Sequence, residues 1–391
     1  MTKIKVPRLR FSEFSGEWKE DKLGDKLYVK MGQSPHSENY TKDNKKNILV
    51  QGNADILNGK INPRIYTSEI TKMSKKNEII MSVRAPVGEL AINQFENVVI
   101  GRGVASLSGN KFDYYSLINI KNKGLWKRFS SGSTFDAVNS SDIKLMTINF
   151  PQENEQQKIG DFFTKLDKLI ELQTQKVNQL KKLKHGYLQK MFPQEGETVP
   201  RLRFSGFSGE WKEEKANDIF INESIKNHGY EEVLAATQDN GIVYRKDLDI
   251  DIKFDKTTLN KYKYVIPGNI IISLRSFQGG FEVSNKKGII SPAYTIMSFK
   301  DSENNINYWK QYLKTYKFIQ SLKKVTFGIR DGRSISFKEF STLKLKFTEN
   351  KNEQQKIGDF FAKLDKLIEE QSVKLDQLKQ QKKAYLQKMF I

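Results

Sequence analysis

Composition and charge set the first limits on what this protein can be. Its 391 residues include 66 Lys and Arg against 46 Asp and Glu, a formal net charge of +20, and no cysteine, which excludes disulfides, thiolate zinc sites and cysteine nucleophiles. The length predicts two domains. Because we find neither a secretory signal nor about 18 consecutive apolar residues, we expect a soluble cytoplasmic protein. Residues 1–200 and 201–391 each carry +10, which favours an anionic partner such as nucleic acid or an anionic lipid surface.

The chain contains two copies of one plan. Residues 6–20, VPRLRFSEFSGEWKE, recur at 199–213 with a single change. Residues 155–192 recur at 353–390 with 28 of 38 positions identical, whereas the segments between these ends differ strongly. Such a distribution indicates that the ends serve one shared task, while the middles perform different versions of a second task.

The two middles, about 21–150 and 214–350, have the pattern of mixed α/β units. Short runs rich in Ile, Val, Tyr and Phe predict strands, and the Gly, Asn and Ser between them predict polar loops. The expected strands are 78–83, 98–100, 143–150, 270–274 and 343–347, and the expected helices lie near 125–129 and 308–324. A trace of the repeat survives where IIMSVRAPVG, which contains Arg84, matches IIISLRSFQG, which contains Arg275.

Each repeated C-terminal block predicts one long helix. Both blocks run without proline through strong helix formers for about 38 residues, which is roughly 57 Å. Asn154 and Asn352 are the expected N-caps, with Gln157 and Gln355 three residues later as in a capping box. Pro151 precedes the first helix whereas Thr348 stands near the equivalent place in the second half, so the start of the second helix is less well defined by sequence.

Apolar residues in these two blocks follow the alternating four- and three-residue spacing of a coiled-coil seam. The expected seam consists of Ile159, Phe163, Leu166, Ile170, Gln173, Val177, Leu180 and Tyr187, and of Ile357, Phe361, Leu364, Ile368, Gln371, Leu375, Leu378 and Tyr385. Polar residues in a seam weaken it but fix its register. We hypothesise an antiparallel pair in which Gln173 and Gln371 meet near the midpoint; the alternative is that each helix packs only on its own domain.

Motifs for catalysis are missing. The sequence has no GxxxxGK[ST] phosphate-binding loop and no Asn/Asp-Pro-Pro-aromatic tetrapeptide of the amino-methyltransferase kind. Its three histidines, His36, His185 and His228, lack the spacing of a metal site or a catalytic triad. The alternating acids Asp247, Asp249 and Asp251 are typical of a solvated strand, although a metal site there stays open. An enzyme function for this chain alone is therefore weakly supported, and we expect neither a catalytic nor a metal site.

Residue types that read DNA occur on segments that we expect to be loops. Arginine pairs with guanine, and Asn or Gln with adenine, while Lys, Ser and Thr hold phosphates. The candidates in the first middle are Gln51, Asn53, Arg84, Arg102, Lys127, Arg128, Ser130, Ser131, Ser133 and Thr134; those in the second are Gln238, Asn240, Arg275, Ser276, Gln278, Lys323, Lys324, Arg330 and Arg333. The alternatives are that Arg84 and Arg275 pair with a buried acid and stabilise the sheet, and that the two late loops are merely solvated.

Taken together, the doubled EQQKIGDFF…KLDKLI helices, the duplicated PRLRF…FSGEW segments and the IIMSVR and IIISLR strands resemble the specificity (S) subunit, HsdS, of type I restriction-modification systems over essentially the full length. This resemblance implies an α+β fold with two target recognition domains joined by two long antiparallel coiled-coil helices and related by an internal pseudo-two-fold. The corresponding segments are 1–152 and 200–351 for the recognition domains, 153–192 and 352–391 for the spacer helices, and 193–199 for a hinge.

The resemblance also implies a role. The two recognition domains would each read one half of a split, asymmetric DNA site, and the helices would fix the gap and dock two modification (methyltransferase) subunits. Restriction (translocase-nuclease) subunits would join the complex. S-adenosylmethionine, ATP and Mg are expected on those partners, with no cofactor in this chain. Two other functions stay open: a coiled-coil scaffold that touches DNA nonspecifically, and a solitary modification enzyme, which the missing motifs disfavour.

Overall fold

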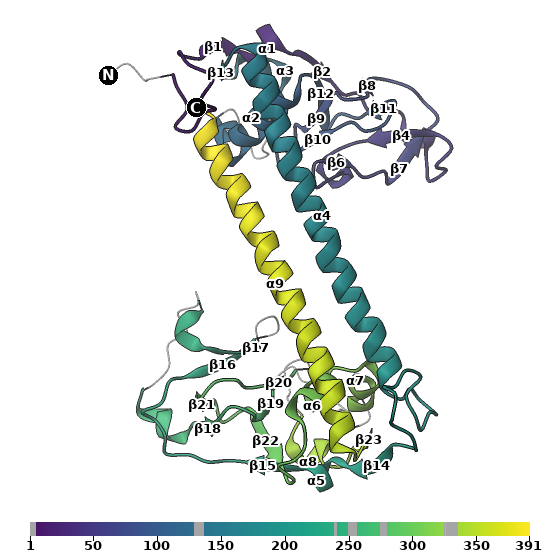
Figure 1. The fold of residues 1–391 in the computed structure, drawn as a ribbon. Helices are drawn as coiled ribbons and strands as arrows, with labels where there is room; N and C mark the ends of the chain where they lie inside the picture. Colours follow the sequence, from purple (N-terminus) through teal and green to yellow (C-terminus); the bar gives the residue numbers. More distant parts are fainter. Residues whose placement is uncertain are drawn as a thin grey trace. The chain divides into compact units, whose positions relative to one another are not determined.

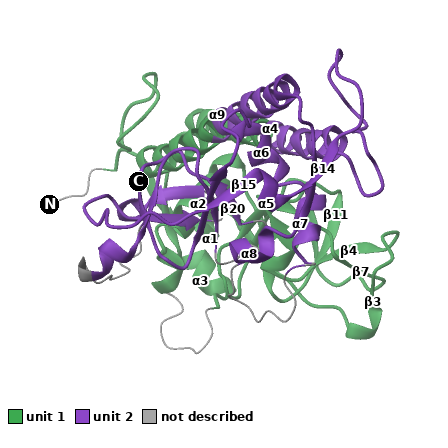
Figure 2. Cartoon of the chain, turned by 90° about the horizontal axis from the view of Figure 1, so that it is seen from below, with its two compact units in different colours: residues 1–174, 373–391 green, residues 175–372 purple. Residues whose placement is uncertain are grey.

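A computed structural model of the chain describes residues 5–128, 137–237, 241–248, 256–273, 280–323, 325 and 335–391. The chain divides into two compact units, each discontinuous in sequence: unit 1 comprises 1–174 and 373–391, and unit 2 comprises 175–372 (Figure 2). The division falls within the two long helices. The segment 193–198, which we expected to belong to a hinge, lies inside unit 2, where the Lys317 and Lys346 ammonium groups bond to carbonyls of Gln194 and Glu197.

Unit 1 is built mainly on two sheets. Their strand orders are β2-β12-β9-β10-β6-β5 and β3-β7-β4-β11-β8, and a further ladder, β1-β13, closes the domain. The bounds of its strands are β1 Lys19–Lys22, β2 Tyr28–Met31, β3 Tyr40–Thr41, β4 Asn47–Val50, β5 Ile56–Leu57, β6 Lys60–Ile61, β7 Ile65–Thr67, β8 Met73–Lys75, β9 Ile79–Ser82, β10 Leu90–Ile92, β11 Asn97–Ile100, β12 Val104–Ser108 and β13 Thr147–Phe150. The helices are α1 Leu23–Lys26, η1 Ser37–Asn39, η2 Asn53–Asp55, α2 Lys111–Asn122, η3 Leu125–Arg128, α3 Ser140–Leu145 and the first half of α4 Glu153–Met191.

Unit 2 repeats the plan with shorter sheets, of order β15-β22-β19-β20, β16-β17, β18-β21 and β14-β23. Its strands are β14 Lys212–Lys215, β15 Phe220–Glu223, β16 Leu234–Thr237, β17 Gly241–Tyr244, β18 Lys263–Val265, β19 Ile270–Ile272, β20 Phe281–Val283, β21 Gly288–Ile290, β22 Thr295–Phe299 and β23 Lys344–Phe347. Its helices are α5 Ala216–Ile219, η4 Arg245–Asp247, η5 Lys256–Lys261, α6 Ile306–Tyr312, α7 Tyr316–Leu322, α8 Phe337–Phe340 and the first half of α9 Lys351–Met389.

The central strand of each unit is apolar on both faces, because it separates two hydrophobic clusters. In β9, Ile79 and Met81 face the helices while Ile80 faces the second sheet. In β19, Ile270 and Ile272 belong to the cluster that includes the helices, and Ile271 belongs to the other cluster. Alternate side chains of a strand point to opposite faces, so an uninterrupted apolar run fits a strand buried on both sides. The expected α+β fold with an internal repeat is confirmed.

The helices α4 and α9 pack together in each unit (Figure 1). Phe162 of α4 contacts Tyr385 of α9 at 5.1 Å between ring centroids, and Tyr187 of α4 contacts Phe360 of α9 at 4.9 Å. The order of these contacts along the two helices makes them antiparallel. All sixteen expected seam residues are buried or half-buried. That Gln173 and Gln371 meet stays a prediction.

Two lysines that interrupt the seam make cross-helix ion pairs. Lys184 lies 2.6 Å from Asp365, and Lys382 lies 2.5 Å from Asp167. Each of these aspartates also accepts a hydrogen bond from its own domain, Asp167 from the Tyr115 hydroxyl and Asp365 from the Gln311 amide. In each unit the same aspartate therefore ties the sheet-containing domain to both helices. The alternative, in which each helix packs only on its own domain, is not what the structure shows.

Several expected local features are corrected by the structure. Residues 143–145 belong to α3, so only the second part of the expected 143–150 strand is a strand. The expected helix 308–324 is two helices, α6 and α7, separated at 313–315, where the Thr315 hydroxyl accepts a hydrogen bond from the Phe318 amide and caps α7. The helix near 125–129 is the 3-10 turn η3. Helix α2 was not expected.

The expected N-caps of the long helices are wrong by at least one residue. The helices begin at Glu153 and Lys351, which places Asn154 and Asn352 within the first turn. In α9 the cap is Asn350, whose Oδ1 accepts a hydrogen bond from the Glu353 amide. The start of this helix is well defined after all, since the Thr348 hydroxyl donates to Glu353 at 2.6 Å.

Candidate nucleic-acid interface

Four strand ends of unit 1 meet at one edge of its sheets. Strands β4 and β11 are parallel neighbours, so both finish at this edge. The antiparallel pairs β9·β12 and β2·β12 bring the ends of β9 and β2 to the start of β12. Backbone hydrogen bonds close the junction: Gly101 N donates to Val50 O at 2.8 Å, Gly32 N to Val104 O at 3.0 Å and Val83 N to Gly103 O at 2.9 Å.

A cavity of about 310 Å³ opens at this junction. Its lining consists of Ser34, Tyr40, Gln51, Gly52, Asn53, Arg84, Ala85, Arg102 and Gly103. The first four DNA-reading candidates, Gln51, Asn53, Arg84 and Arg102, thus lie together although they are up to 51 positions apart in sequence. Two guanidinium groups and two carboxamides on one small surface are suited to the edges of bases or to phosphates.

Two glycines at this junction leave no room for a side chain. A Cβ on Gly103 would lie 2.0 Å from the carbonyl oxygen of Gln51, and a Cβ on Gly32 would lie 2.1 Å from that of Gly101. Because both obstacles are backbone atoms, the chain could accommodate a side chain only by moving the strand ends apart. The close approach of three strand ends therefore fixes the separation of the lining residues.

The sequence interpretation missed Ser34 and Tyr40, which line the cavity, and Asp55, which bonds to the backbone of the lining. Ser34 accepts a hydrogen bond at its hydroxyl from the Arg102 amide, at 3.1 Å. Tyr40 lines the cavity and donates its hydroxyl hydrogen to Pro35 O at 3.2 Å. Asp55, only 3% exposed, accepts hydrogen bonds at Oδ2 from the amides of Gln51 and Gly52. The bond from Gln51 to Asp55 had one local signal in the sequence: an Asp four residues after Gln51, which can accept hydrogen bonds from nearby backbone amides.

Among the described residues, Arg84 has no acid partner of the kind that the alternative interpretation requires. Arg84 is exposed, and neither its guanidinium nor that of Arg102 makes an ion pair with any residue in the described ranges. Four other arginines are each paired with a carboxylate: Arg10 with Glu155, Arg64 with Asp55, Arg201 with Glu197 and Arg203 with Glu353. Arg84 and Arg102 therefore remain available to a ligand rich in hydrogen-bond acceptors.

The other candidates are placed only in part. Lys127 and Arg128 end η3, and Lys323 follows α7. Ala137, the next described residue after Arg128, forms a bridge with Arg84 beside the cavity. Outside the described residues lie Ser130, Ser131, Ser133, Thr134, Gln238, Asn240, Arg275, Ser276, Gln278, Lys324, Arg330 and Arg333.

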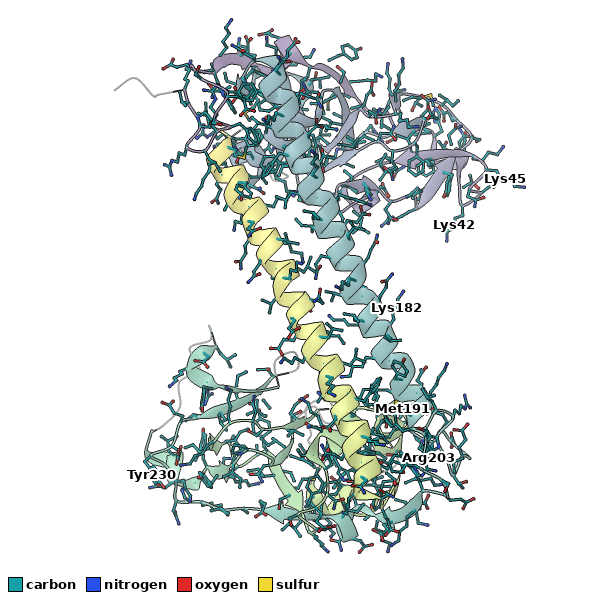
Figure 3. The ribbon with its side chains drawn as sticks, in the orientation of Figure 1. Lys42, Lys45, Lys182, Met191, Arg203 and Tyr230 are labelled. Atoms are coloured by element: carbon teal, nitrogen blue, oxygen red, sulfur yellow. The ribbon has the colours of Figure 1, made fainter. Side chains whose placement is uncertain are left out.

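Further basic and aromatic side chains are exposed away from the long helices. Lys42 and Lys45 lie on the connection between β3 and β4 of unit 1, and Tyr230 lies on the connection between β15 and β16 of unit 2 (Figure 3). The Tyr230 hydroxyl is 3.0 Å from Nδ1 of His228, whose ring stacks on Tyr264 at 4.0 Å.

In the described part of the chain, no group of three or more His, Cys, Asp or Glu could hold a metal ion. None of the described helices is both long and apolar enough to cross a membrane.

Comparison with known proteins assigns a family to part of the chain. The type I restriction modification DNA specificity domain matches residues 15–182, which include the cavity and the first half of the repeat. Residues 15–182 belong to this specificity-domain family. Over 180 residues, the chain is 34% identical to a protein assigned as the MjaX type I restriction enzyme specificity subunit of Methanocaldococcus jannaschii, covering 44% of this chain and 42% of that protein.

A second relative and two solved structures extend the comparison. The MjaIX type I restriction enzyme specificity subunit of the same organism is 35% identical over 104 residues, covering 25% of this chain and 23% of that protein. The chain thus matches less than half the length of these relatives. The crystal structure of the type I restriction-modification S subunit from M. genitalium has the same fold over 99% of both chains, with a TM-score of 0.67 and 18% identity. A chain from a structural study of type I system assembly and conformational transition covers 95% of this chain and 97% of its own, with a TM-score of 0.54 and 17% identity.

Proposed function

We propose that this chain is the DNA sequence-recognition subunit of a type I restriction-modification complex, and that each unit reads one half of a bipartite, asymmetric site on double-stranded DNA. The observation that carries the proposal is the meeting of Gln51, Asn53, Arg84 and Arg102 at one cavity inside the family-matched region. These side chains offer donors and acceptors for base edges. The surplus of +20 supplies the attraction to phosphates.

In unit 2 the corresponding bases would be read by residues next to equivalent strands. The sequence aligns Gln238 and Asn240 with Gln51 and Asn53, and Arg275 with Arg84. Val233, just before β16, bridges Ile289 of β21 in parallel, as β4 pairs with β11, so the strand that leads to Gln238 has a counterpart of the β4·β11 pairing beside it. The runs 127–134 and 323–333 would hold phosphates with their Lys, Arg, Ser and Thr side chains.

The long helices would set the gap between the half-sites. A helix of 39 residues extends about 58 Å, enough to separate two readers by about one DNA turn, roughly 34 Å. The remaining surface of these helices would dock two modification (methyltransferase) subunits, which restriction subunits join. Catalysis would belong to these partners together with S-adenosylmethionine, ATP and Mg. The place of action would be the cytoplasm, where the DNA is.

The test is single-molecule methylation mapping of genomic DNA from cells that carry this chain with its cognate modification subunits, compared with cells that lack the chain. We expect a bipartite methyladenine motif that disappears with the gene. If no motif depends on the chain, the recognition function is refuted and a scaffold that binds DNA without sequence preference becomes the better explanation. Neutralising several surface lysines should weaken binding to all sequences alike and reduce its salt dependence.

A further inference from the structure

The cavity of unit 1 holds two arginines, Arg84 and Arg102, for which the described residues supply no carboxylate partner. Arg84 follows β9, and Arg102 lies between β11 and β12. Neither guanidinium bonds to a carboxylate in the described ranges, and no acidic residue lines the cavity. Two positive groups held near one another without compensation favour a ligand that presents acceptors. Gln51 and Asn53 share the cavity and add both donors and acceptors.

The backbone that carries each arginine is fixed. Arg102 N donates to the Ser34 hydroxyl at 3.1 Å, and the flanking glycines, Gly101 and Gly103, are bonded to Val50 and Val83. Arg84 forms a bridge with Ala137, and Val138 N donates to Val83 O at 3.0 Å. Because the main chain on both sides is tied to strands, the guanidinium groups start from defined positions. A reader of base edges needs such preorganisation more than a phosphate contact does.

Asp55 fixes the third part of the site. Its Oδ2 accepts hydrogen bonds from Gln51 N at 2.8 Å and from Gly52 N at 3.2 Å, and its Oδ1 lies 3.3 Å from Nε of Arg64. The carboxylate is buried, so these bonds are not replaced readily by water. Asp55 therefore holds the turn from which Gln51 and Asn53 line the cavity, without lining it itself.

The hydrogen-bonding groups that line the cavity of unit 1 suit guanine better than phosphate. Guanine presents O6 and N7 in the major groove, and the planar fork of arginine can bond to both at once. Lysine also binds phosphate, as a point charge, and lysine is plentiful elsewhere on this chain. Two arginines without an acid partner among the described residues lie beside two carboxamides, and no lysine lines the cavity, which matches base edges better.

We propose that Arg84 and Arg102 read guanine in the half-site bound by unit 1, and that Asp55 and Ser34 are positioning residues for this recognition. The inference rests on the proposed function and deepens it. Unit 2 lacks part of the set, because its connection between β21 and β22, Ser291–Tyr294, reads SPAY and contains no arginine. The Arg102 contact is therefore specific to the half-site of unit 1.

The test uses the full chain with its modification subunits and compares R84K, R102K and D55N with the wild type by methylation mapping. Each Arg→Lys variant keeps the charge but loses the fork. We expect discrimination at one guanine position to fall about 5- to 150-fold, the range for one bidentate contact. D55N should relax positions in that same half-site, while the other half-site stays unchanged. R8K, at an exposed arginine of unit 1 outside the cavity, is the matched control and should leave the motif unchanged.

A second measurement separates base reading from folding defects. Replacing the guanine by 7-deazaguanine removes the N7 acceptor, so it should weaken binding of the wild-type complex but not weaken R102K further at the position read by Arg102. If R84K and R102K keep the motif intact and lower methylation of all sites alike, the arginines contact phosphate and the inference is overturned. Equal sensitivity of wild type and R102K to 7-deazaguanine at every guanine also overturns it. Failure of the proposed function is distinct, since the wild type itself would then yield no bipartite motif.

Discussion

Removal of Arg10 should destabilise unit 1 more than removal of its counterpart Arg203 destabilises unit 2. Arg10 bonds to Glu155 through Nε and Nη2, both at 2.7 Å, and the Glu155 side chain is 1% exposed. Arg203 forms the same fork with Glu353 at 2.6 and 2.8 Å. The two carboxylates differ in one contact, because Glu353 also accepts a hydrogen bond from the Thr348 hydroxyl at 2.6 Å.

The loss of stability in each variant depends on which hydrogen bonds the buried carboxylate keeps after its arginine is removed. Breaking a buried ion pair by removing one partner costs about 3–5 kcal/mol, since an uncompensated charge stays buried. We expect R10M to approach this cost. In R203M the Thr348 hydrogen bond to a charged acceptor stays, and such a bond contributes about 1.5–3 kcal/mol. We therefore expect R203M to cost about 1–3 kcal/mol, and the double variant R10M/E155L to recover most of the loss because no buried charge remains.

Hydrogen exchange measured by mass spectrometry can assign the loss to each unit. Peptides from 155–174 should lose protection in R10M, and peptides from 353–372 should lose less in R203M. R8M, which removes an exposed arginine from the same segment, is the matched control and should change neither. The reasoning is refuted if R10M costs less than about 1 kcal/mol, or if R10M/E155L is no more stable than R10M.

Three further predictions concern pH, assembly and spacing. Burial raises the pKa of Asp113 to about 6, so this carboxyl binds its proton more tightly in the folded state and its contribution to stability falls as pH rises from about 4 to 6; D113N should flatten the urea-denaturation profile across that window, by up to about 3 kcal/mol. A fragment of residues 1–192 should form a homodimer in analytical ultracentrifugation, because Tyr187, Lys184 and Phe192 can replace Tyr385, Lys382 and Phe390 against the first half of α4; a fragment ending at residue 172 should stay monomeric. Deleting one heptad from the 155–192 helix should alter the gap in the methylation motif or abolish binding while each domain stays folded, and an unchanged gap would count against the spacer function.

The coiled-coil spacing predicted the two long helices well, whereas the shorter patterns predicted the strands and short helices only in part. The seam pattern extends over some 38 residues, so α4 and α9 were expected within two residues of their observed ends. Helix α2 was missed because most of its side chains, including Phe112, Tyr114 and Leu117, are buried, which removes the amphipathic period. Its signal was a capping box, in which the Asn110 side chain accepts from the Asp113 amide and the Asp113 carboxylate from the Asn110 amide.

The sequence predicted which residue types form the candidate site, but not which residues the fold brings together there. Gln51 and Arg102 were chosen because such residues read bases, yet nothing local places them together. Their proximity depends on the parallel pairing of β4 with β11, which joins residues 50 positions apart. Ser34 was missed for the same reason, since only the folded sheets bring Arg102 near it. Asp55 and Tyr40 bond to residues close in sequence, so their signals were local and were overlooked.

The contacts of the repeated ends explain why they are so similar while the middles differ. Leu9 N donates to Lys388 O, and Leu202 N to Lys190 O, both at 2.9 Å. Trp18 contacts Phe390 at 6.4 Å, and Trp211 contacts Phe192 at 5.9 Å. In each unit the entry segment therefore packs on the C-terminal end of one long helix, and the same contacts are made in both units.

The middles are free of this restriction because each begins and ends at one place. Lys19 pairs with Phe150 in the β1·β13 ladder, and Lys212 pairs with Phe347 in β14·β23. A middle that starts and finishes on such a ladder can change its strands and loops without moving the helices. Because Arg84 and Arg102 lie at the far ends of β9 and β11, the cavity lining of unit 1 can change while its ladder and its long helices stay the same.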